Sequence, residues 1–197
     1  MLSLKSIFAA FAVLVAAPLA VAPIAAAQGT NVVVIDRAQI LGQSKAGVDM
    51  QTKLSNLGTT MNNELVPTAN ELQAERTAID TKAEGKTRDD ILADAALTEE
   101  IRQLAAKAQK FQYDTQVANQ ELALTERAAL ISFNRALVPI LEAVITETGA
   151  NVILDQSQVI FVDDATDVTA SVIAKLDAAT PTIEVVRQKL PPPQPQQ

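Results

Sequence analysis

The segment Asn151–Asp177, NVILDQSQVIFVDDATDVTASVIAKLD, decides the fold because it combines strand-like and helix-like patterns at the end of a mostly helical chain. Two apolar, largely β-branched runs, Val152–Leu154 and Val159–Val162, flank the polar turn Asp155–Gln158. An acidic loop and a short amphipathic helix follow. Since two short strands are not stable alone in water, this segment must pair with strand-forming residues elsewhere in the chain.

The missing partner lies near the start of the chain, in Asn31–Asp36, NVVVID. Its run of β-branched residues follows Gly29 and has the length of a strand. Helical patterns fill the sequence between this strand and Asn151. We therefore expect one small sheet from which a helical hairpin leaves and to which it returns.

The first helix of the hairpin shows apolar residues spaced by three, four or seven positions. These residues are Met50, Leu54, Leu57, Met61, Leu65 and Leu72. Pro67 should kink this helix. The pattern breaks at Lys82–Arg88, where Gly85 suits a helix C-terminus and Thr87 can cap the next helix.

The second helix has a coiled-coil seam that is only weakly apolar, with many Ala and Thr positions. The seam contains Leu97, Ile101, Leu104, Ala108, Phe111, Thr115, Ala118, Leu122, Thr125 and Ala129. Beyond it, Leu130–Ile145 is apolar on most sides, which predicts a helix buried all round. Pro139 should kink this helix or begin a new one, and Gly149 should end it.

The two ends of the chain have distinct compositions. Lys5, the apolar run Ile7–Ala17 and the small residues Ala25–Ala27 are typical of a cleaved signal peptide over 1–27. An uncleaved membrane anchor is the alternative, but two prolines and the absence of a basic flank disfavour it. At the other end, 181–197 is rich in Pro and Gln, which predicts a disordered tail. The alternative interpretation of that tail is a polyproline ligand for a partner protein.

Composition excludes several classes of function. The chain has 16 Lys and Arg against 23 Asp and Glu, so removal of Lys5 changes the net charge from −7 to −8. This charge disfavours nucleic acid as a partner and allows at most peripheral membrane contact. The absence of His and Cys excludes serine triads, cysteine nucleophiles and the usual zinc ligand sets. We expect no enzyme, no cofactor and no metal site.

Two polar clusters suggest chemistry but favour structural roles. Ser44 and Lys45 could form a catalytic dyad, yet adjacent residues of a helix point about 100° apart. Close packing of Ala46 and Gly47 near the sheet explains this stretch better. The acidic run Asp163–Asp167 lacks the pattern of a calcium loop, so we interpret it as a solvated loop that leads into a helix cap.

The predicted fold is α+β, with a small body of three or four strands per chain and a protruding antiparallel helical arm. We place the domain at 28–180, the body at 30–45 and 134–178, and the arm at 46–133. About 45 residues per helix would give an arm of roughly 65–70 Å. Because so small a body buries little surface on its own, we expect identical copies to assemble. The body of this oligomer should use Val33, Ile35, Leu137, Ile140, Val144, Ile153 and Ile160.

The order of these elements resembles the Skp/OmpH family of periplasmic chaperones. The resemblance is carried by Val33–Asp36, Ser44–Gly47, Val138–Ile140, Thr148–Asp155 and Val159–Leu176. It implies a trimer whose arms surround a cavity and which holds unfolded outer-membrane β-barrel proteins without ATP, in the periplasm of a Gram-negative cell. Among the arm residues we expect to contact clients are Met50, Met61, Leu65 and Phe111. A coiled-coil spacer or adaptor of the cell envelope is the alternative.

Overall fold

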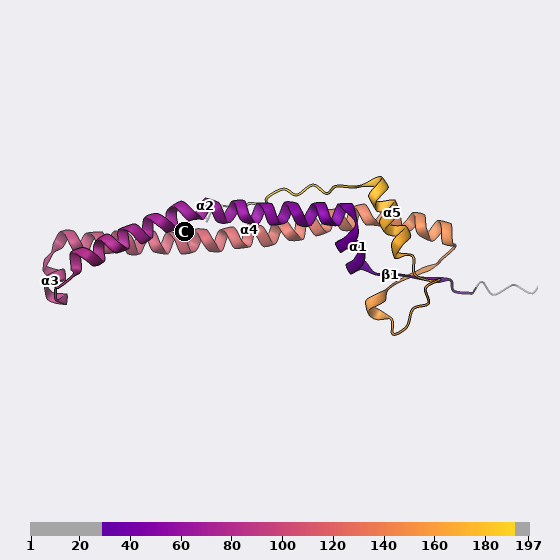
Figure 1. The fold of residues 1–197 in the computed structure, drawn as a ribbon, viewed down its shortest axis with the longest axis horizontal. Helices are drawn as coiled ribbons and strands as arrows, with labels where there is room; N and C mark the ends of the chain where they lie inside the picture. Colours follow the sequence, from indigo (N-terminus) through magenta and orange to yellow (C-terminus); the bar gives the residue numbers. More distant parts are fainter. Residues whose placement is uncertain (1–28, 192–197) are drawn as a thin grey trace, which may run out of the picture.

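The computed structural model describes residues 29–191. The predicted signal peptide, 1–27, and the last six residues lie outside the described part of the chain. In order, the elements are β1 (Val32–Ile35), α1 (Arg37–Gln43), α2 (Lys45–Ala83), α3 (Arg88–Ala93), α4 (Ala95–Thr148), β2 (Val152–Asp155), the 3₁₀ turn η1 (Gln156–Gln158) and α5 (Thr169–Ala179). Figure 1 shows α2 and α4 side by side as one long arm, with α3 at its tip and the strands, α1 and α5 at the other end.

The sheet has two strands rather than three or four. β1 and β2 are parallel, with Val32 opposite Val152 and Ile35 opposite Asp155. On its other edge β1 forms a single bridge, because Val34 donates to the carbonyl of Thr166 and accepts from the N–H of Val168. Both edges of β1 are therefore occupied.

The prediction of a strand at Val159–Val162 is wrong for the single chain. In the predicted polar turn, Gln156–Gln158 form η1, and the carboxylate of Asp155 accepts from the N–H of Ser157 at 2.9 Å. The chain then loops away from the sheet. In this loop Ile160 is fully exposed and Phe161 is 81% exposed. The run has the composition of a strand, but β1 offers it no free edge.

The path from the sheet into the arm turns sharply between α1 and α2. The hydroxyl of Ser44 accepts from the N–H of Gly47 at 3.1 Å and so caps α2. Asp177 of α5 accepts from the N–H of Lys45 at 2.7 Å. Ala46 and Gly47 are buried. The expected packing role of this stretch is therefore confirmed, and the Ser44 hydroxyl serves as a helix cap.

The arm follows the sequence pattern closely. α2 has 39 residues, which corresponds to about 58 Å. At the tip Gly85 has a φ of +76°, and Thr87 forms a reciprocal capping box with Asp90. α4 runs without interruption through Pro139, so this proline does not begin a new helix. Pro67 likewise lies inside a continuous α2.

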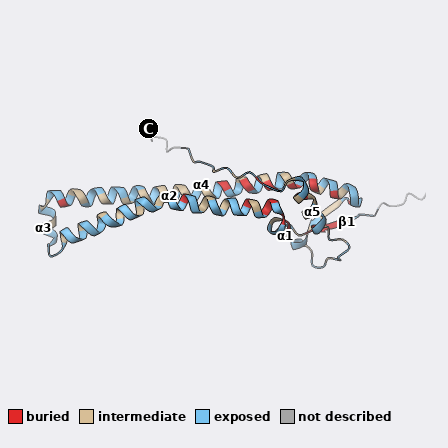
Figure 2. Cartoon of the chain, turned by 45° about the horizontal axis from the view of Figure 1, so that its top comes forward, coloured by how far each residue is buried: buried red, intermediate tan, exposed pale blue. Residues whose placement is uncertain are grey.

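The core lies where the arm meets the body. Its buried members include Ile35, Ile40, Ala46, Met50, Ala129, Phe133, Leu137, Ile140, Val144, Val172, Leu176 and Ile183. Figure 2 shows buried residues concentrated at this end and mostly exposed residues along the rest of the arm. α4 buries only one face here, since Ile131 and Val138 are more than half exposed. The prediction of a helix buried all round therefore fails within one chain.

The C-terminal segment is ordered as far as the structure describes it. Residues 181–191, expected to be disordered, run back in an extended conformation along α2 and α4 (Figure 1). Ile183 is part of the core, and Arg187 forms ion pairs with both arm helices. The prediction of disorder is therefore wrong for 181–191. These contacts join residues more than 60 positions apart, which no local pattern in the sequence reveals.

Candidate functional site

An apolar cleft opens between the two arm helices in the distal half of the arm. Its volume is about 480 Å³. α2 contributes Ala69, Leu72, Gln73 and Arg76, and α4 contributes Ile101, Leu104, Ala105, Ala108 and Phe111. The cleft forms because the small residues of the α4 seam do not fill the space between the helices. Its walls combine aliphatic side chains with one aromatic ring.

Ion pairs join α2 and α4 in the same half of the arm, beside a second pocket whose lining includes Glu75, Lys82, Glu100 and Lys107. Lys107 of α4 pairs with Glu75 and with Glu71 of α2, and these hydrogen bonds raise the pKa of the Lys107 amine. Nearer the tip, Lys82 and Glu100 pair at 2.7 Å. Exposed pairs of this kind contribute little to stability, because solvent screens them. They set the alignment of α2 and α4 while leaving the cleft easy to open.

The predicted client-contacting residues fall into two groups. Phe111 lines the cleft and is partly buried, and Leu65 is also partly buried on α2. Met50 and Met61 are almost fully buried within the chain, and Met50 belongs to the core. Met50 and Met61 are therefore packing residues in this structure, because a buried side chain offers no surface to a client.

The residues predicted for the trimer body are also split. Val33, Ile35, Leu137, Ile140 and Val144 are buried within a single chain, and Ile153 packs against this core. They hold together the body of one protomer. Ile160 is fully exposed.

α4 carries an open apolar surface that was not predicted from the sequence. Leu124, Ile131 and Val138 are each at least 40% exposed and recur every seven residues. Such spacing places them on one face of the helix. The seven-residue repeat could have been found in the sequence, but the assumption that α4 is buried all round concealed it. On β2, Leu154 is exposed as well.

The acidic loop after the sheet is largely exposed, as its composition indicated, but the expected side-chain cap is absent, since α5 has Val168 at its N-cap with no side-chain cap hydrogen bond. Asp163 accepts from the N–H of Ala165, and Asp167 accepts from the N–H of Thr169 at the start of α5. The hydroxyl of Thr169 accepts from the N–H of Asp36 at 2.8 Å, which ties the loop to the start of α1. Within residues 29–191, no group of three acidic side chains is arranged to hold a metal ion.

One helix of the described chain, α4, is long and apolar enough to cross a membrane by length and composition. The apolar part of this helix is the end that enters the core, where Phe133, Leu137, Ile140 and Val144 are buried. The 18-residue window of α4 that meets this criterion is 28% buried, so packing against α2 and α5 covers only part of its apolar surface.

Comparison with known proteins identifies the family. A sequence profile described as outer membrane protein (OmpH-like) matches residues 31–176, which include the sheet, the arm and most of α5. The chain belongs to the OmpH-like family. Among proteins with curated descriptions, none matches this OmpH-like chain in sequence.

The fold of this OmpH-like protein is similar to that of a solved bacterial structure. This is the crystal structure of a candidate outer membrane chaperone (OmpH-like) from Caulobacter crescentus CB15, with a TM-score of 0.72 and 27% sequence identity. The similarity covers 82% of this chain and 92% of that chain. The family is a non-enzymatic chaperone family, in agreement with the absence of His and Cys.

Proposed function

We propose that this OmpH-like protein is an ATP-independent holdase that binds unfolded outer-membrane β-barrel proteins in the periplasm. The observation that carries the proposal is the apolar cleft lined by Phe111, on an arm that projects away from the core. An arm that contributed only to stability would bury its seam along its whole length. This arm keeps apolar surface open to solvent, in a family that includes outer membrane chaperones.

The chemistry of the cleft suits an unfolded barrel strand. Such strands alternate apolar and polar residues and expose unpaired backbone groups, so they aggregate when unprotected. A cleft of about 480 Å³ can take apolar side chains without selecting one sequence. Because the ion pairs that join α2 and α4 are exposed, separation of the two helices should cost little free energy. Binding of this kind requires no nucleotide.

Trimer formation is the second part of the proposal. Leu154, Ile160 and Phe161 are exposed near the sheet, and Ile131 and Val138 are exposed on α4. The outer edge of β2 is also free within residues 29–191. Apolar side chains beside a free strand edge are unfavourable in water. Identical copies would cover them and would arrange three arms around a common cavity.

The test is prevention of aggregation. An outer-membrane β-barrel protein unfolded in urea is diluted into buffer with and without this protein, in the absence of nucleotide, and light scattering is recorded. We expect suppression at about one trimer per client, and weaker suppression by Phe111→Ser. Tyr113→Ser is the matched control because Tyr113 is exposed on a different side of α4.

The competing function, an envelope spacer or adaptor, gives a different result. An adaptor would leave the aggregation of the barrel protein unchanged and would recover one or two folded partners from a cell extract. Equal suppression by both serine variants would place client binding outside the cleft and would contradict this part of the proposal.

A further inference from the structure

The C-terminal segment 181–191, here called the strap, connects the two helices of the arm. Near the body, Asp49 of α2 accepts from the N–H of Ile183, and the amine of Lys53 donates to the carbonyl of Ile183, both at 2.9 Å. The side chain of Ile183 is buried in the core. The first half of the strap is therefore fixed to the base of α2.

The far end of the strap contacts both helices at once. The guanidinium of Arg187 donates to Glu64 of α2 at 2.8 Å and to Glu121 of α4 at 2.9 Å. Backbone N–H groups of the strap also donate to α4, from Gln188 to Thr125 and from Leu190 to Glu121. The side chain of Arg187 thus bridges α2 and α4 in the second half of the strap.

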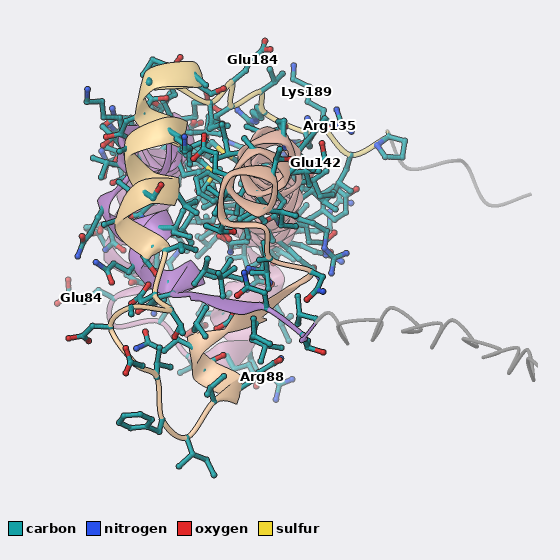
Figure 3. The ribbon with its side chains drawn as sticks, turned by 90° about the vertical axis from the view of Figure 1, so that its right-hand side faces the viewer. Glu84, Arg88, Arg135, Glu142, Glu184 and Lys189 are labelled. Atoms are coloured by element: carbon teal, nitrogen blue, oxygen red, sulfur yellow. The ribbon has the colours of Figure 1, made fainter. Side chains whose placement is uncertain are left out.

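From Ile183 to Arg187 the strap alternates between residues that face the arm and residues that face solvent. Ile183 is buried, and Val185 and Arg187 are partly buried. Glu184 and Lys189 point away from the helices (Figure 3). Backbone and alternate side chains together therefore hold the strap in its groove, as in a strand that lies on a surface.

Loss of the ion pair between Arg187 and Glu121 should destabilise the protein, because Glu121 is buried. Its side chain is 8% exposed, and burial alone would raise its pKa. Hydrogen bonds from the N–H of Leu190 and from Arg187 outweigh that effect and hold the pKa of Glu121 below its usual value. Without Arg187, a buried carboxylate loses its cation, which strongly destabilises the closed arrangement.

Within the described residues, the contacts of the strap with the arm reach Glu64 of α2 and Glu121 of α4, and beyond these positions buried residues are sparse. In α2 the last buried residue is Met61. In α4, Leu97 and Glu121 are buried, but every residue that lies between them is at least partly exposed. We propose that the strap is a clamp that stiffens the proximal arm and confines separation of α2 from α4 to the part beyond Glu64 and Glu121. This inference rests on the geometry of the arm and holds whether or not the protein is a holdase.

Amide hydrogen exchange on the full protein tests the clamp. In Arg187→Ala, exchange in 51–66 of α2 and 116–130 of α4 should rise about tenfold or more, since the buried charged contact is lost. Exchange in 70–110, beyond the clamp, should stay within about twofold of the parent protein. Glu184→Ala is the matched control, because Glu184 points into solvent (Figure 3), and it should match the parent throughout.

A variant truncated after Thr180 provides a second test. It should reproduce the regional pattern of Arg187→Ala with a larger effect, because the contacts of Ile183 are lost as well. Equal exchange in Arg187→Ala and Glu184→Ala would overturn the proposal. So would an increase that spreads evenly to the tip of the arm, because the strap would then act only on overall stability.

Discussion

Replacement of Gly47 by alanine tests how the arm is joined to the body. Gly47 is buried in the first turn of α2. A Cβ at this position would overlap the carbonyl oxygen of Leu41 and lie 2.7 Å from its carbonyl carbon. Real Cβ atoms essentially never approach another atom within 3.0 Å. The backbone of α1 would therefore have to move away from α2.

The expected cost follows from two opposing effects. Overpacking costs about 1–3 kcal/mol, and the value should be near about 3 kcal/mol because backbone cannot rotate out of the way. Alanine is about 1 kcal/mol better than glycine within a helix. The free energy of unfolding should therefore fall by about 2 kcal/mol, which lowers the Tm by about 4–8 °C for a chain of this size.

Thermal unfolding followed by far-UV circular dichroism, at one protein concentration, measures this difference. Gly42→Ala is the control, because a Cβ at Gly42 meets nothing within 4 Å. It should unfold at the parent temperature or slightly above it. A Gly47→Ala protein that is as stable as Gly42→Ala would refute the close approach of α1 and α2 at this turn.

Three further outcomes follow from the same structure. Phe161→Asp, which adds a charge to the exposed loop, should shift the protein from trimer toward monomer in light scattering; an unchanged mass would exclude this loop from the interface. Pro67→Ala restores a helix hydrogen bond and should slow amide exchange over 63–72, which unchanged exchange would contradict. The lowered pKa of Glu121 means that its stabilising contribution is complete above the usual Glu value of about 4.3 and is lost as the pH falls through the folded-state pKa. The Tm difference between the parent and Arg187→Ala should thus be constant at neutral pH and shrink only as the pH falls below the usual Glu value; a difference that already shrinks above that value would contradict a lowered pKa of Glu121.

Local patterns in the sequence were sufficient for much of this fold. The β-branched run before Asp36 predicted β1, the spacing of apolar residues predicted α2 and α4, and Gly85 with Thr87 predicted the turn at the tip. Each of these features depends on residues within a few positions of one another. For that reason the sequence alone contains the necessary information.

The features that the sequence did not predict correctly depend on contacts between residues far apart in the chain. Val159–Val162 has strand composition, but whether it pairs depends on a free strand edge, and Thr166 and Val168 occupy the second edge of β1. The strap looked disordered because its order comes from Asp49 and Glu121, far away in the sequence. Phe111 was found from the seam pattern, whereas the cleft it lines depends on how α2 and α4 diverge.

Site-specific crosslinking tests the central claim that an unfolded client occupies the arm cleft. A photoreactive phenylalanine analogue is placed at Phe111, which lines the cleft, or at Tyr113, which is exposed and points about 200° away around α4. Each protein is then irradiated with an unfolded outer-membrane β-barrel protein bound. We predict strong crosslinks from position 111 and few from position 113. Equal crosslinking from both positions, or none from position 111, would contradict the claim.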